Sequence, residues 1–550
     1  MDVVRGVDAL SVVVVPAKDE EQLIGGCLEA LARQTVPPGD FRTIVVLDGC
    51  RDNTEAVVRE TAAALELSVE LLAGPGVGAG AARRAGMDAA ADLLTRLGAP
   101  DGLIACTDAD SRPAPDWLAR QLEHLRNGAR VVAGLIELDR EESDLLPGAV
   151  LRRRDNDAVS RLRSVREETP GAAHHHFAGA SLGIAAGVYR QVGGLDPVAA
   201  LEDAAFAVKL AEHRVPVLYA ADVRVQTSAR QEGRARRGLA LDIAVSAWSE
   251  HRRYRAADFP LPLLQRAKRG VCVDVIVPTK ECAATVAEVL RRTVDPLSRA
   301  GLVDEIVVVD AGSADGTAGY AAAAGARVLQ QDELLPGYGP ARGKGDAMWR
   351  ALHATSGEIV CFLDGDTGDP DPDHLRGLLG PLLTDASVQL VKGAFERPLR
   401  AGELDLAHEG GRVTELMARP LLNLHEPRLA GFSQPLAGEF AARRALLEAL
   451  PFPVGYGVEI AVLIDALREC GLDALAECQL GTRQNRHQPL RALGEMAFAV
   501  LAAVERRVGD DRSTVGGHFL RPWQDGAVIR VPIGERPPLA SLRSRGRVSR

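Results

Sequence analysis

The sequence lacks the long hydrophobic runs, paired cysteines and basic excess that mark several large classes of protein. No apolar run in its 550 residues reaches the roughly 18 needed to span a bilayer, and Asp2, Arg5 and Asp8 stand where a signal peptide would be apolar. The eight cysteines are scattered without a Cys-x-x-Cys, which argues against a disulfide framework or a zinc site. The net charge of −10 argues against a nucleic-acid-binding protein. We therefore expect a cytoplasmic protein with reduced thiols, no transmembrane segment and no nucleic-acid partner.

What the sequence does contain is a long internal repeat. Each copy has a valine-rich run ending in proline, an Asp 32 positions after that proline, and an Asp-x-Asp after a later apolar run. These features are Pro16, Asp48 and Asp108–Asp110 in the first copy, and Pro278, Asp310 and Asp364–Asp366 in the second. A repeat of about 260 residues is too long for a solenoid unit, so it indicates two similar domains in tandem.

Short apolar runs alternate with helix-like stretches in both halves. The predicted strands are 11–15, 43–47, 102–107, 130–134, 273–277, 305–309 and 358–363, and the predicted helices are 20–33, 53–67, 283–293 and 315–325. This alternation predicts an α/β fold with a doubly wound, Rossmann-like sheet in each half. We expect a first domain over 1–240, an Arg-rich helical linker over 241–270, a second domain over 271–506 and a loose tail over 507–550.

The polar motifs fall at the carboxyl ends of predicted strands, where open α/β sheets bind their ligands. An Asp-x-Asp at such a place offers hard oxygen ligands to a Mg²⁺ or Mn²⁺ that bridges two phosphates. The cation would neutralise a departing diphosphate. A single Asp-x-Asp is often only an acidic turn, but its recurrence after matched motifs predicts one phosphate-binding crevice in each domain.

On these motifs the chain resembles nucleotide-sugar glycosyltransferases of the GT-A fold, over almost its whole length apart from linker and tail. The resemblance implies two tandem GT-A domains, each binding a nucleotide-sugar donor with Mg²⁺ or Mn²⁺. In the first domain it assigns the donor to Pro16, Glu20, Asp48 and Asp108 and the metal to Asp110. In the second it assigns the donor to Pro278, Thr279, Lys280, Glu281, Asp310, Ser313 and Asp364 and the metal to Asp366.

In the second half, the segments Pro278-Thr-Lys-Glu281, Gly343-Lys-Gly345 and Gly410-Gly-Arg-Val-Thr414 follow one another between about 273 and 490. With them this half resembles a narrower family, the retaining glucosyl-3-phosphoglycerate synthases. Lys344 opens a predicted helix, so its ammonium and the helix N-terminus would both face the donor diphosphate. A Walker A loop is the rival interpretation, and it fails because Gly345 stands where a Ser or Thr must hold magnesium. The resemblance places Leu436 at the sugar pocket and Glu459 beside the transferred glucose.

The segment Gly410-Gly-Arg-Val-Thr414 precedes a predicted helix and offers backbone N–H groups, a guanidinium and a hydroxyl. The resemblance assigns Gly411, Arg412 and Thr414 to the 3-phosphoglycerate acceptor. Standing alone, the segment would be interpreted as a capped surface helix.

One departure from the family concerns the metal. The family has a metal-binding His in a Gly-x-Arg-x-His-Arg segment, and here Asn485 stands at that position with His487 two residues later. Residues i and i+2 of an extended segment face the same way. Either His487 takes over as ligand, or Asn485 offers a weaker amide oxygen.

The first half matches only the broad, inverting pattern of family 2 type. Glu202-Asp203 opens a predicted helix where that family keeps its base, and Asp203 is our candidate for it, with a helix cap as the alternative. Arg83 and Arg84 are candidates for the role of Lys344. The basic segment 224–237 would cover the diphosphate, hold an anionic acceptor or be a solvated face.

The leading hypothesis is that the second domain transfers glucose, from UDP-glucose, to 3-phosphoglycerate, and that the first is an inverting glycosyltransferase of unknown substrate. In the alternatives, the first half is a silent nucleotide-sugar-binding or scaffold module, or the second half transfers mannose. A nucleotidyltransferase would need a Gly-rich loop directly after the first strand, which neither half has. The narrower family commonly forms dimers, so the resemblance also implies a homodimer.

Overall fold

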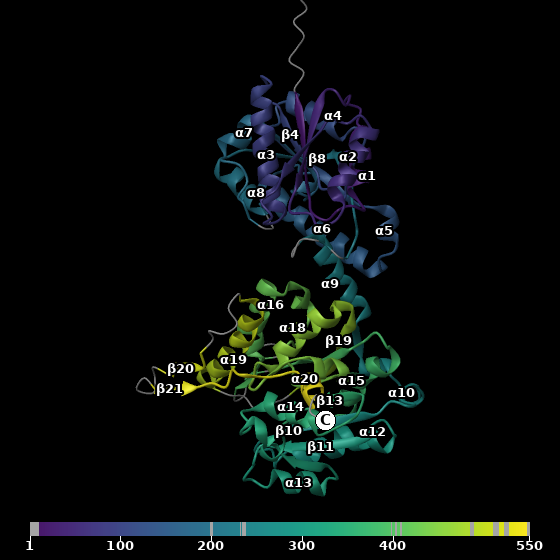
Figure 1. Cartoon of the computed structure of the whole chain (residues 1–550), viewed down its shortest axis with the longest axis vertical. Helices are drawn as coiled ribbons and strands as arrows, with labels where there is room; N and C mark the ends of the chain where they lie inside the picture. Colours follow the sequence, from purple (N-terminus) through teal and green to yellow (C-terminus); the bar gives the residue numbers. More distant parts are fainter. Residues whose placement is uncertain are drawn as a thin grey trace, which may run out of the picture. The chain divides into compact units, whose positions relative to one another are not determined.

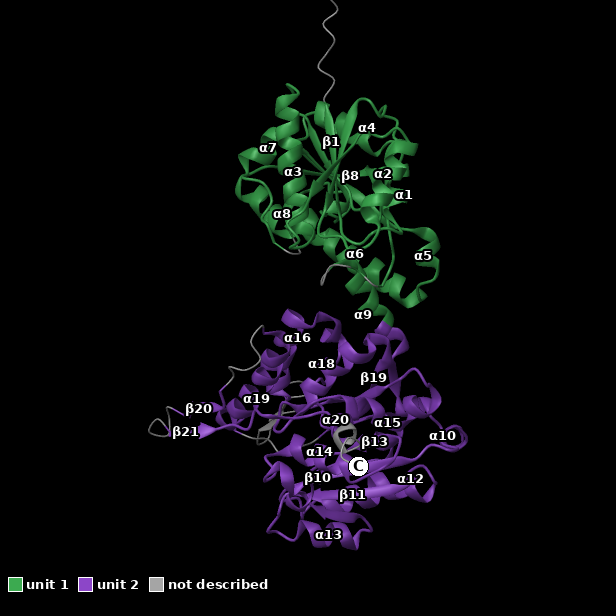
Figure 2. Ribbon diagram, viewed as in Figure 1, with its two compact units in different colours: residues 1–247 green, residues 248–550 purple. Residues whose placement is uncertain are grey.

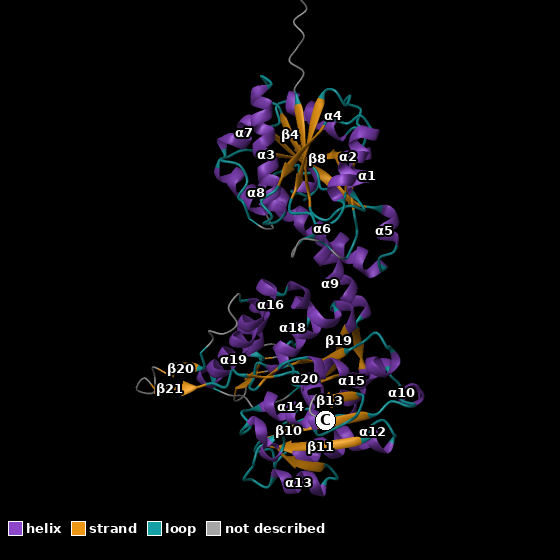
Figure 3. Ribbon diagram, viewed as in Figure 1, coloured by secondary structure: helices purple, strands orange, loops and turns teal. Residues whose placement is uncertain are grey.

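A computed structural model of the whole chain describes residues 10–198, 202–231, 233, 238–397, 399–401, 404–406, 410–483, 489–509, 516–521 and 527–546 (Figure 1). The chain divides into two compact units, unit 1 over 1–247 and unit 2 over 248–550 (Figure 2). Each unit has a central sheet flanked by helices (Figure 3). Within the described residues, no helix is both long and apolar enough to cross a membrane.

Unit 1 follows the predicted strand–helix alternation. Its strands are β1 (Ser11–Ala17), β2 (Phe41–Leu47), β3 (Val69–Ala73), β4 (Leu103–Cys106), β5 (Ser111–Pro113), β6 (Val131–Leu138), β7 (Leu182–Ala185) and β8 (Val217–Thr227). Its helices are α1 (Ile24–Ala32), α2 (Thr54–Ala64), α3 (Ala79–Arg96), α4 (Trp117–Arg126), α5 (Arg140–Asp144), α6 (Gly148–Glu168), α7 (Ala186–Gln191), α8 (Glu202–Glu212), the 3-10 turn η1 (Gly179–Ser181) and α9 (Leu239–His251), which runs across the unit boundary.

The sheet of unit 1 has the order β3-β2-β1-β4-β7-β6-β8-β5. The valine run 12–15 in β1 is apolar throughout because both faces of the strand are buried. Val12 and Val14 pack into one hydrophobic cluster with α3 and α7, while Val13 and Val15 pack into another with α1 and α4. This two-sided burial confirms the doubly wound architecture. Strand β7 pairs antiparallel with β4 and β6, which the sequence pattern did not predict.

Unit 2 repeats this plan. Its strands are β9 (Arg253–Arg255), β10 (Val273–Thr279), β11 (Glu305–Asp310), β12 (Arg327–Gln330), β13 (Ile359–Phe362), β14 (Leu390–Glu396), β15 (Leu399–Ala401), β16 (Leu404–Leu406), β17 (Phe440–Arg443), β18 (Phe452–Pro453), β19 (Leu475–Thr482), β20 (His518–Arg521), β21 (Ala527–Arg530) and β22 (Glu535–Arg536). Its α-helices are α10 (Leu261–Ala267), α11 (Val286–Val289), α12 (Asp295–Arg299), α13 (Thr317–Ala323), α14 (Lys344–His353), α15 (Pro372–Thr384), α16 (Arg419–His425), α17 (Arg444–Ala449), α18 (Val458–Cys470), α19 (Leu490–Val508) and α20 (Leu539–Gly546). Short 3-10 or π turns lie at Ala256–Asp258, Leu290–Val294, Gln331–Glu333, Pro336–Tyr338, Thr414–Ala418, Pro427–Gly431 and Leu472–Ala474.

The sheet of unit 2 has the order β12-β11-β10-β13-β17-β14-β19-β9. Seven of its strands occupy the same places as β3, β2, β1, β4, β7, β6 and β8 of unit 1. The eighth differs, because β5 follows the Asp-x-Asp and lies antiparallel to β8, whereas β9 precedes the first strand and lies parallel to β19.

The segment expected as a helical linker, 241–270, contains this strand as well as helix. Arg253 to Arg255 pair with β19, and Arg252 is buried against Asp385 and Asp473. The boundary between the units, after residue 247, lies inside the segment. Its arginines therefore belong partly to the sheet edge of unit 2.

The tail expected to be loose, 507–550, packs against unit 2 in its described part. Strand β22 pairs with β18, and Arg536 binds the fully buried Asp346 with nitrogen–oxygen distances of 2.9 and 2.6 Å. Trp349 Nε1 donates to Pro537 O at 2.9 Å. A buried charge needs a partner, and the tail supplies one to α14.

The residues that follow β1 and β10 correspond between the units, but the matching motifs do not align Glu20 with its true counterpart. Glu20 N–H donates to Thr54 Oγ1, and Cys282 N–H donates to Thr317 Oγ1 in the same way. Glu20 therefore has Cys282, and not Glu281, as its counterpart.

The ends of the second strands are offset by one residue. Asp48 N–H donates to Ala17 O, whereas in unit 2 the N–H of Ala311 donates to Thr279 O. The equal spacing of 32 residues therefore does not make Asp48 and Asp310 structural equivalents.

Candidate functional site

Unit 2 contains a cavity of about 710 Å³ at the carboxyl ends of β10 and β13. Most of the predicted residues of this unit line it. They are Pro278, Thr279, Lys280, Lys344, Asp364, Asp366, Gly411, Arg412, Thr414, Leu436 and Glu459. Residues up to 181 positions apart in the sequence thus meet at one sheet edge, as the strand ends of an α/β fold require.

Three predicted donor residues of unit 2 lie beside the cavity without lining it. Asp310 is buried and accepts hydrogen bonds from Ser313 N–H at 2.9 Å and Ser313 Oγ at 2.6 Å. Glu281 accepts from Ala314 N–H at 2.9 Å. Thr279 Oγ1, which does line the cavity, lies 3.3 Å from Asp310 Oδ1. These bonds hold the loop after β11, in which Ala311 lines the cavity.

Lys344, the first residue of α14, lines the cavity. Its Nζ is 2.7 Å from Asp364 Oδ1 and 2.9 Å from Glu459 Oε1. Burial disfavours the charged amine, but the two carboxylates outweigh it and raise the pKa of Lys344, which therefore stays protonated. Gly438 lets the ammonium approach the chain, because a Cβ at 438 would lie 2.3 Å from Nζ.

The neighbouring Gly343 fixes where α14 begins. It has φ +149°, and a Cβ there would lie 2.9 Å from Val454 O. The left-handed backbone and the close carbonyl both favour glycine. Lys344 is thereby presented from a helix N-terminus, where a phosphate is also favoured.

The two carboxylates of the Asp-x-Asp have different environments. Burial raises the pKa of Asp364, but Lys344 outweighs it and the pKa is lowered overall; for Asp366, burial and the charge of Asp364 raise it. Among the described residues no Lys or Arg forms an ion pair with Asp366, and its carboxylate lines the cavity. Such an oxygen fits Mg²⁺ or Mn²⁺. The other predicted ligands, Asn485 and His487, lie outside the described residues.

The predicted acceptor residues form one wall. Gly411 has φ +70°, and its C=O accepts from Glu415 N–H at 3.1 Å, which turns the chain into the helical segment that starts at Thr414. Thr414 is buried, and Arg412 lines the cavity with Tyr456. A guanidinium, a hydroxyl and a glycine backbone together suit a small phosphorylated acid.

Several residues that the sequence did not single out belong to this site. Arg397, Arg483 and the tail residues 530–532 line the cavity. Arg483 is buried and pairs with Glu439. Arg483 is the arginine of the Gly-x-Arg-x-His-Arg segment, so a sequence signal existed for it. Nothing in the sequence connects Arg397 or the tail with the site.

Lys392 is a further buried lysine, bonded to the chain between Leu436 and Gly438, which line the cavity. Its Nζ donates to Ala437 O at 2.5 Å and lies 4.9 Å from the ring of Phe440. Burial lowers its pKa to about 7.

In unit 1 an arginine takes the place of Lys344. Arg83 is 4% exposed and donates to Asp108 at 2.8 Å, to Glu202 at 3.0 Å and to Gly179 O at 3.1 Å. Arg83 thus joins the first Asp of the Asp-x-Asp to a carboxylate that opens a helix, as Lys344 does. Arg84 does not share this role, because it binds Leu195 O.

The candidate base Asp203 lies beside this group. Its Oδ1 accepts from Ala204 N–H at 2.8 Å, and burial and the nearby Glu202 raise its pKa. The carboxylate that contacts Arg83 is that of Glu202, the first residue of α8, which is 6% exposed.

Two further predicted acids of unit 1, Glu20 and Asp110, are bound by Arg230, which follows β8. Its Nη1 and Nη2 donate to Glu20 at 2.8 and 2.6 Å, and Nη2 also donates to Asp110 at 2.8 Å. The predicted metal ligand Asp110 is therefore already neutralised by a cation of the protein. The residues of unit 1 do not fit a bound metal in this arrangement.

The predicted donor residue Asp48 has a structural role in unit 1. Asp48 is buried and accepts from Gly76 N–H at 2.6 Å and Gly78 N–H at 3.0 Å, which holds the loop before α3. Pro16, the last predicted donor residue of unit 1, lies in β1 opposite Val46 of β2, the strand that Asp48 follows.

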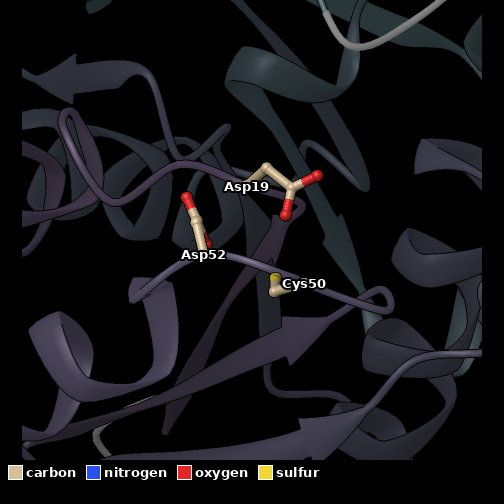
Figure 4. A group of neighbouring side chains, drawn as sticks. All are labelled: Asp19, Cys50 and Asp52. Carbon is tan, nitrogen blue, oxygen red and sulfur yellow. The ribbon is translucent and has the colours of Figure 1, made fainter.

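Asp19, Cys50 and Asp52 place possible ligand atoms within 4.8 Å of one another (Figure 4). Asp19 accepts from Arg51 N–H at 2.6 Å, and Asp52 accepts from Glu21 N–H at 3.1 Å. These bonds tie the loop after β1 to the loop after β2. The hydrogen bonds between the two loops therefore account for the cluster without a metal ion.

A family model for glycosyl transferase family 2 matches residues 12–182 and 274–412, together more than half of the chain. Glucosyl-3-phosphoglycerate synthase of Mycolicibacterium smegmatis is 45% identical over 285 residues, which are 51% of this chain and 93% of that protein. The synthase of the same name from Petrotoga mobilis is 36% identical over 288 residues, which are 50% of this chain and 89% of that protein.

Two solved structures are also similar. Mannosyl-3-phosphoglycerate synthase from Rubrobacter xylanophilus is 44% identical with a TM-score of 0.49, covering 54% of this chain and 98% of its own. Glucosyl-3-phosphoglycerate synthase from Mycobacterium tuberculosis, in complex with Mn²⁺, UDP-glucose and phosphoglyceric acid, is 44% identical with a TM-score of 0.47, covering 52% of this chain and 95% of its own.

Proposed function

The chain belongs to glycosyl transferase family 2 and is a glycosyltransferase, and from this premise we propose that unit 2 transfers glucose from UDP-glucose to 3-phosphoglycerate. The observation that carries the proposal is the single cavity in which Lys344, bound to Asp364 and Glu459, faces the wall of Arg412 and Thr414. It is supported by the 45% identity to a synthase with this activity in its name.

The donor would lie against the strand ends, with its diphosphate near Lys344. The protonated amine and the N-terminus of α14 both favour negative charge there. The residues suited to hold Mg²⁺ or Mn²⁺ are Asp366 and Asp364, with Asn485 or His487 as a further ligand. When bound, the cation would neutralise charge on the leaving diphosphate.

The acceptor would be held by Arg412, Thr414 and the backbone at Gly411, which leaves its hydroxyl free to approach the sugar. Transfer breaks the bond from the sugar C1 to the diphosphate oxygen, which keeps the electron pair, and forms a bond from C1 to the acceptor oxygen. In a retaining, front-face reaction the acceptor proton passes to the leaving phosphate oxygen. Glu459 would stabilise the positive charge that develops on the sugar.

For unit 1 we propose a second, inverting transfer with a substrate of its own. The support is the group of Arg83, Asp108 and Glu202, which repeats that of Lys344, Asp364 and Glu459. An inverting reaction needs a base for the acceptor proton, and Asp203 is the candidate. If Asp203→Asn and Glu202→Gln both leave every sugar-transfer product unchanged, unit 1 is a silent binding module.

The test for unit 2 uses the purified full chain with Mg²⁺, UDP-glucose and 3-phosphoglycerate, with the product mass as readout. We expect a hexosyl-phosphoglycerate whose anomeric configuration, read by NMR, matches that of the donor. GDP-mannose in place of UDP-glucose separates the two sugars. Absence of product while UDP-glucose still binds would show that the acceptor is misassigned.

A further inference from the structure

The two units differ most at the second Asp of the Asp-x-Asp. In unit 2, Asp366 forms no ion pair with a cation of the described chain. In unit 1 the corresponding Asp110 is 2.8 Å from Arg230 Nη2. The side chains of Arg230 and Asp110 are 23% and 18% exposed, so water screens this pair only partly.

The same nitrogen of Arg230 also binds a second carboxylate. Nη2 lies 2.6 Å from Glu20 Oε1, and Nη1 lies 2.8 Å from Glu20 Oε2. Glu20 Oε1 and Asp110 Oδ2 therefore converge on one point, which is occupied by a positive nitrogen. Two carboxylate oxygens converging on a point is also how a protein holds Mg²⁺ or Mn²⁺.

The sequence accounts for the difference between the units. Glu20 has Cys282 as its counterpart, so unit 2 lacks the second carboxylate that fixes an arginine at this point. Arg230 is three residues beyond the end of β8, and the position three residues beyond the end of β19 is Asn485, an uncharged residue.

We infer that the guanidinium of Arg230 occupies the cation position of unit 1, so that unit 1 binds no divalent cation. A phosphate-bearing ligand of unit 1 then meets guanidinium groups where a ligand of unit 2 meets a metal ion. The inference goes beyond the proposed transfer reactions. Only the expected wild-type count of one rests on the metal site proposed for unit 2, and cation binding is measured without turnover.

The test is equilibrium dialysis of the full chain against Mn²⁺, with bound metal counted per chain. We expect one site in the wild type and none in Asp366→Ala. Adding Arg230→Ala to Asp366→Ala should restore one site, because Glu20 and Asp110 lose their cation, and Asp110→Asn should remove it again. Arg230→Lys, which keeps the charge, should restore none.

Arg112→Ala in the Asp366→Ala background is the matched control, since Arg112 forms an exposed pair with Asp139 in the same unit and should leave the count at zero. A Mn²⁺ site that persists in Asp366→Ala and disappears on Asp110→Asn would overturn the inference. So would a folded Arg230→Ala, Asp366→Ala protein that binds no Mn²⁺. If the Arg230→Ala, Asp366→Ala protein unfolds, the Mn²⁺ count of the single Asp366→Ala protein, in which Arg230 is intact, still decides whether unit 1 binds the cation.

Discussion

The ammonium nitrogen of Lys344 lies 2.9 Å from the carboxylate of Glu459. This contact joins the start of α14 to the start of α18, and Asp364 completes it from the end of β13. One positive charge thus serves two acids, the buried Glu459 and the half-buried Asp364, so removing that charge affects both the chemistry and the fold.

Lys344→Met should therefore lower glucosyl transfer by at least about 100-fold and destabilise unit 2 by about 3–5 kcal/mol, because it leaves the buried Glu459 and the half-buried Asp364 without a cation. Steady-state kinetics and urea unfolding measure the two effects. Lys268→Met is the matched control, since Lys268 is a buried lysine of the same unit, paired with Asp304 at 2.6 Å and not among the residues lining the cavity. Equal loss of transfer in both variants would mean that Lys344 acts only through stability.

Asp366→Ala should abolish turnover that depends on Mg²⁺ or Mn²⁺, because its carboxylate is the ligand left free for a cation. The measurement is the rate of transfer across a metal titration, with Asp371→Ala as control. Asp371 caps α15 by accepting from Asp373 N–H at 2.7 Å, so its loss affects the helix end and not the metal. Full activity in the presence of a chelator would contradict the metal role.

Arg412→Ala should raise the KM for 3-phosphoglycerate by about 10- to 100-fold, the value of one charge-assisted hydrogen bond to a charged group. The affinity for UDP-glucose should not change, which calorimetry can check. Arg419→Ala, which removes an exposed pair with Glu415 in the same segment, should leave both constants near wild type. Weaker donor binding with normal acceptor binding would show that the two subsites are misassigned.

Replacing His487 by alanine should raise the metal concentration needed for half-maximal rate more than replacing Asn485, if the imidazole has taken over as ligand. The reverse order would assign the metal to the amide oxygen of Asn485. Titrations of both variants with Mn²⁺ distinguish the two outcomes.

Lys392→Met should change how stability depends on pH. The pKa of Lys392 is lowered to about 7 by burial, whereas an unfolded lysine has a pKa of about 10.4. Between these values the unfolded chain binds more protons, so wild-type stability gains about 1.4 kcal/mol per pH unit from this residue as the pH rises. The stability advantage of the variant should be largest at pH 7 or below and shrink toward pH 10. A pH-independent difference in urea unfolding would contradict this.

The sequence predicted the parts of the fold that depend on local pattern. The run 12–15 is valine at every position, and both faces of β1 are indeed buried. The antiparallel β7 has the same composition as a parallel strand, so its direction is not encoded locally. The one-residue offset that separates Asp48 from Asp310 depends on strand pairing, and no motif spacing reports it.

The site shows the same limit. The sequence predicted that Lys344 opens a helix, and α14 does begin at Lys344. Arg230 and Arg536 act on partners 120 and 190 positions away, Asp110 and Asp346. Such pairs depend on how distant segments meet, and a single sequence carries no signal for them.

Strand β9 has a consequence for any attempt to study unit 2 by itself. A fragment that begins at the first predicted residue of the second domain, 271, would lack the strand that covers β19. The exposed edge would present unpaired N–H and C=O groups along a strand with Ala476 and Cys478 in its core. Such a fragment would self-associate through its sheet edge, and one that starts before Arg252 would not.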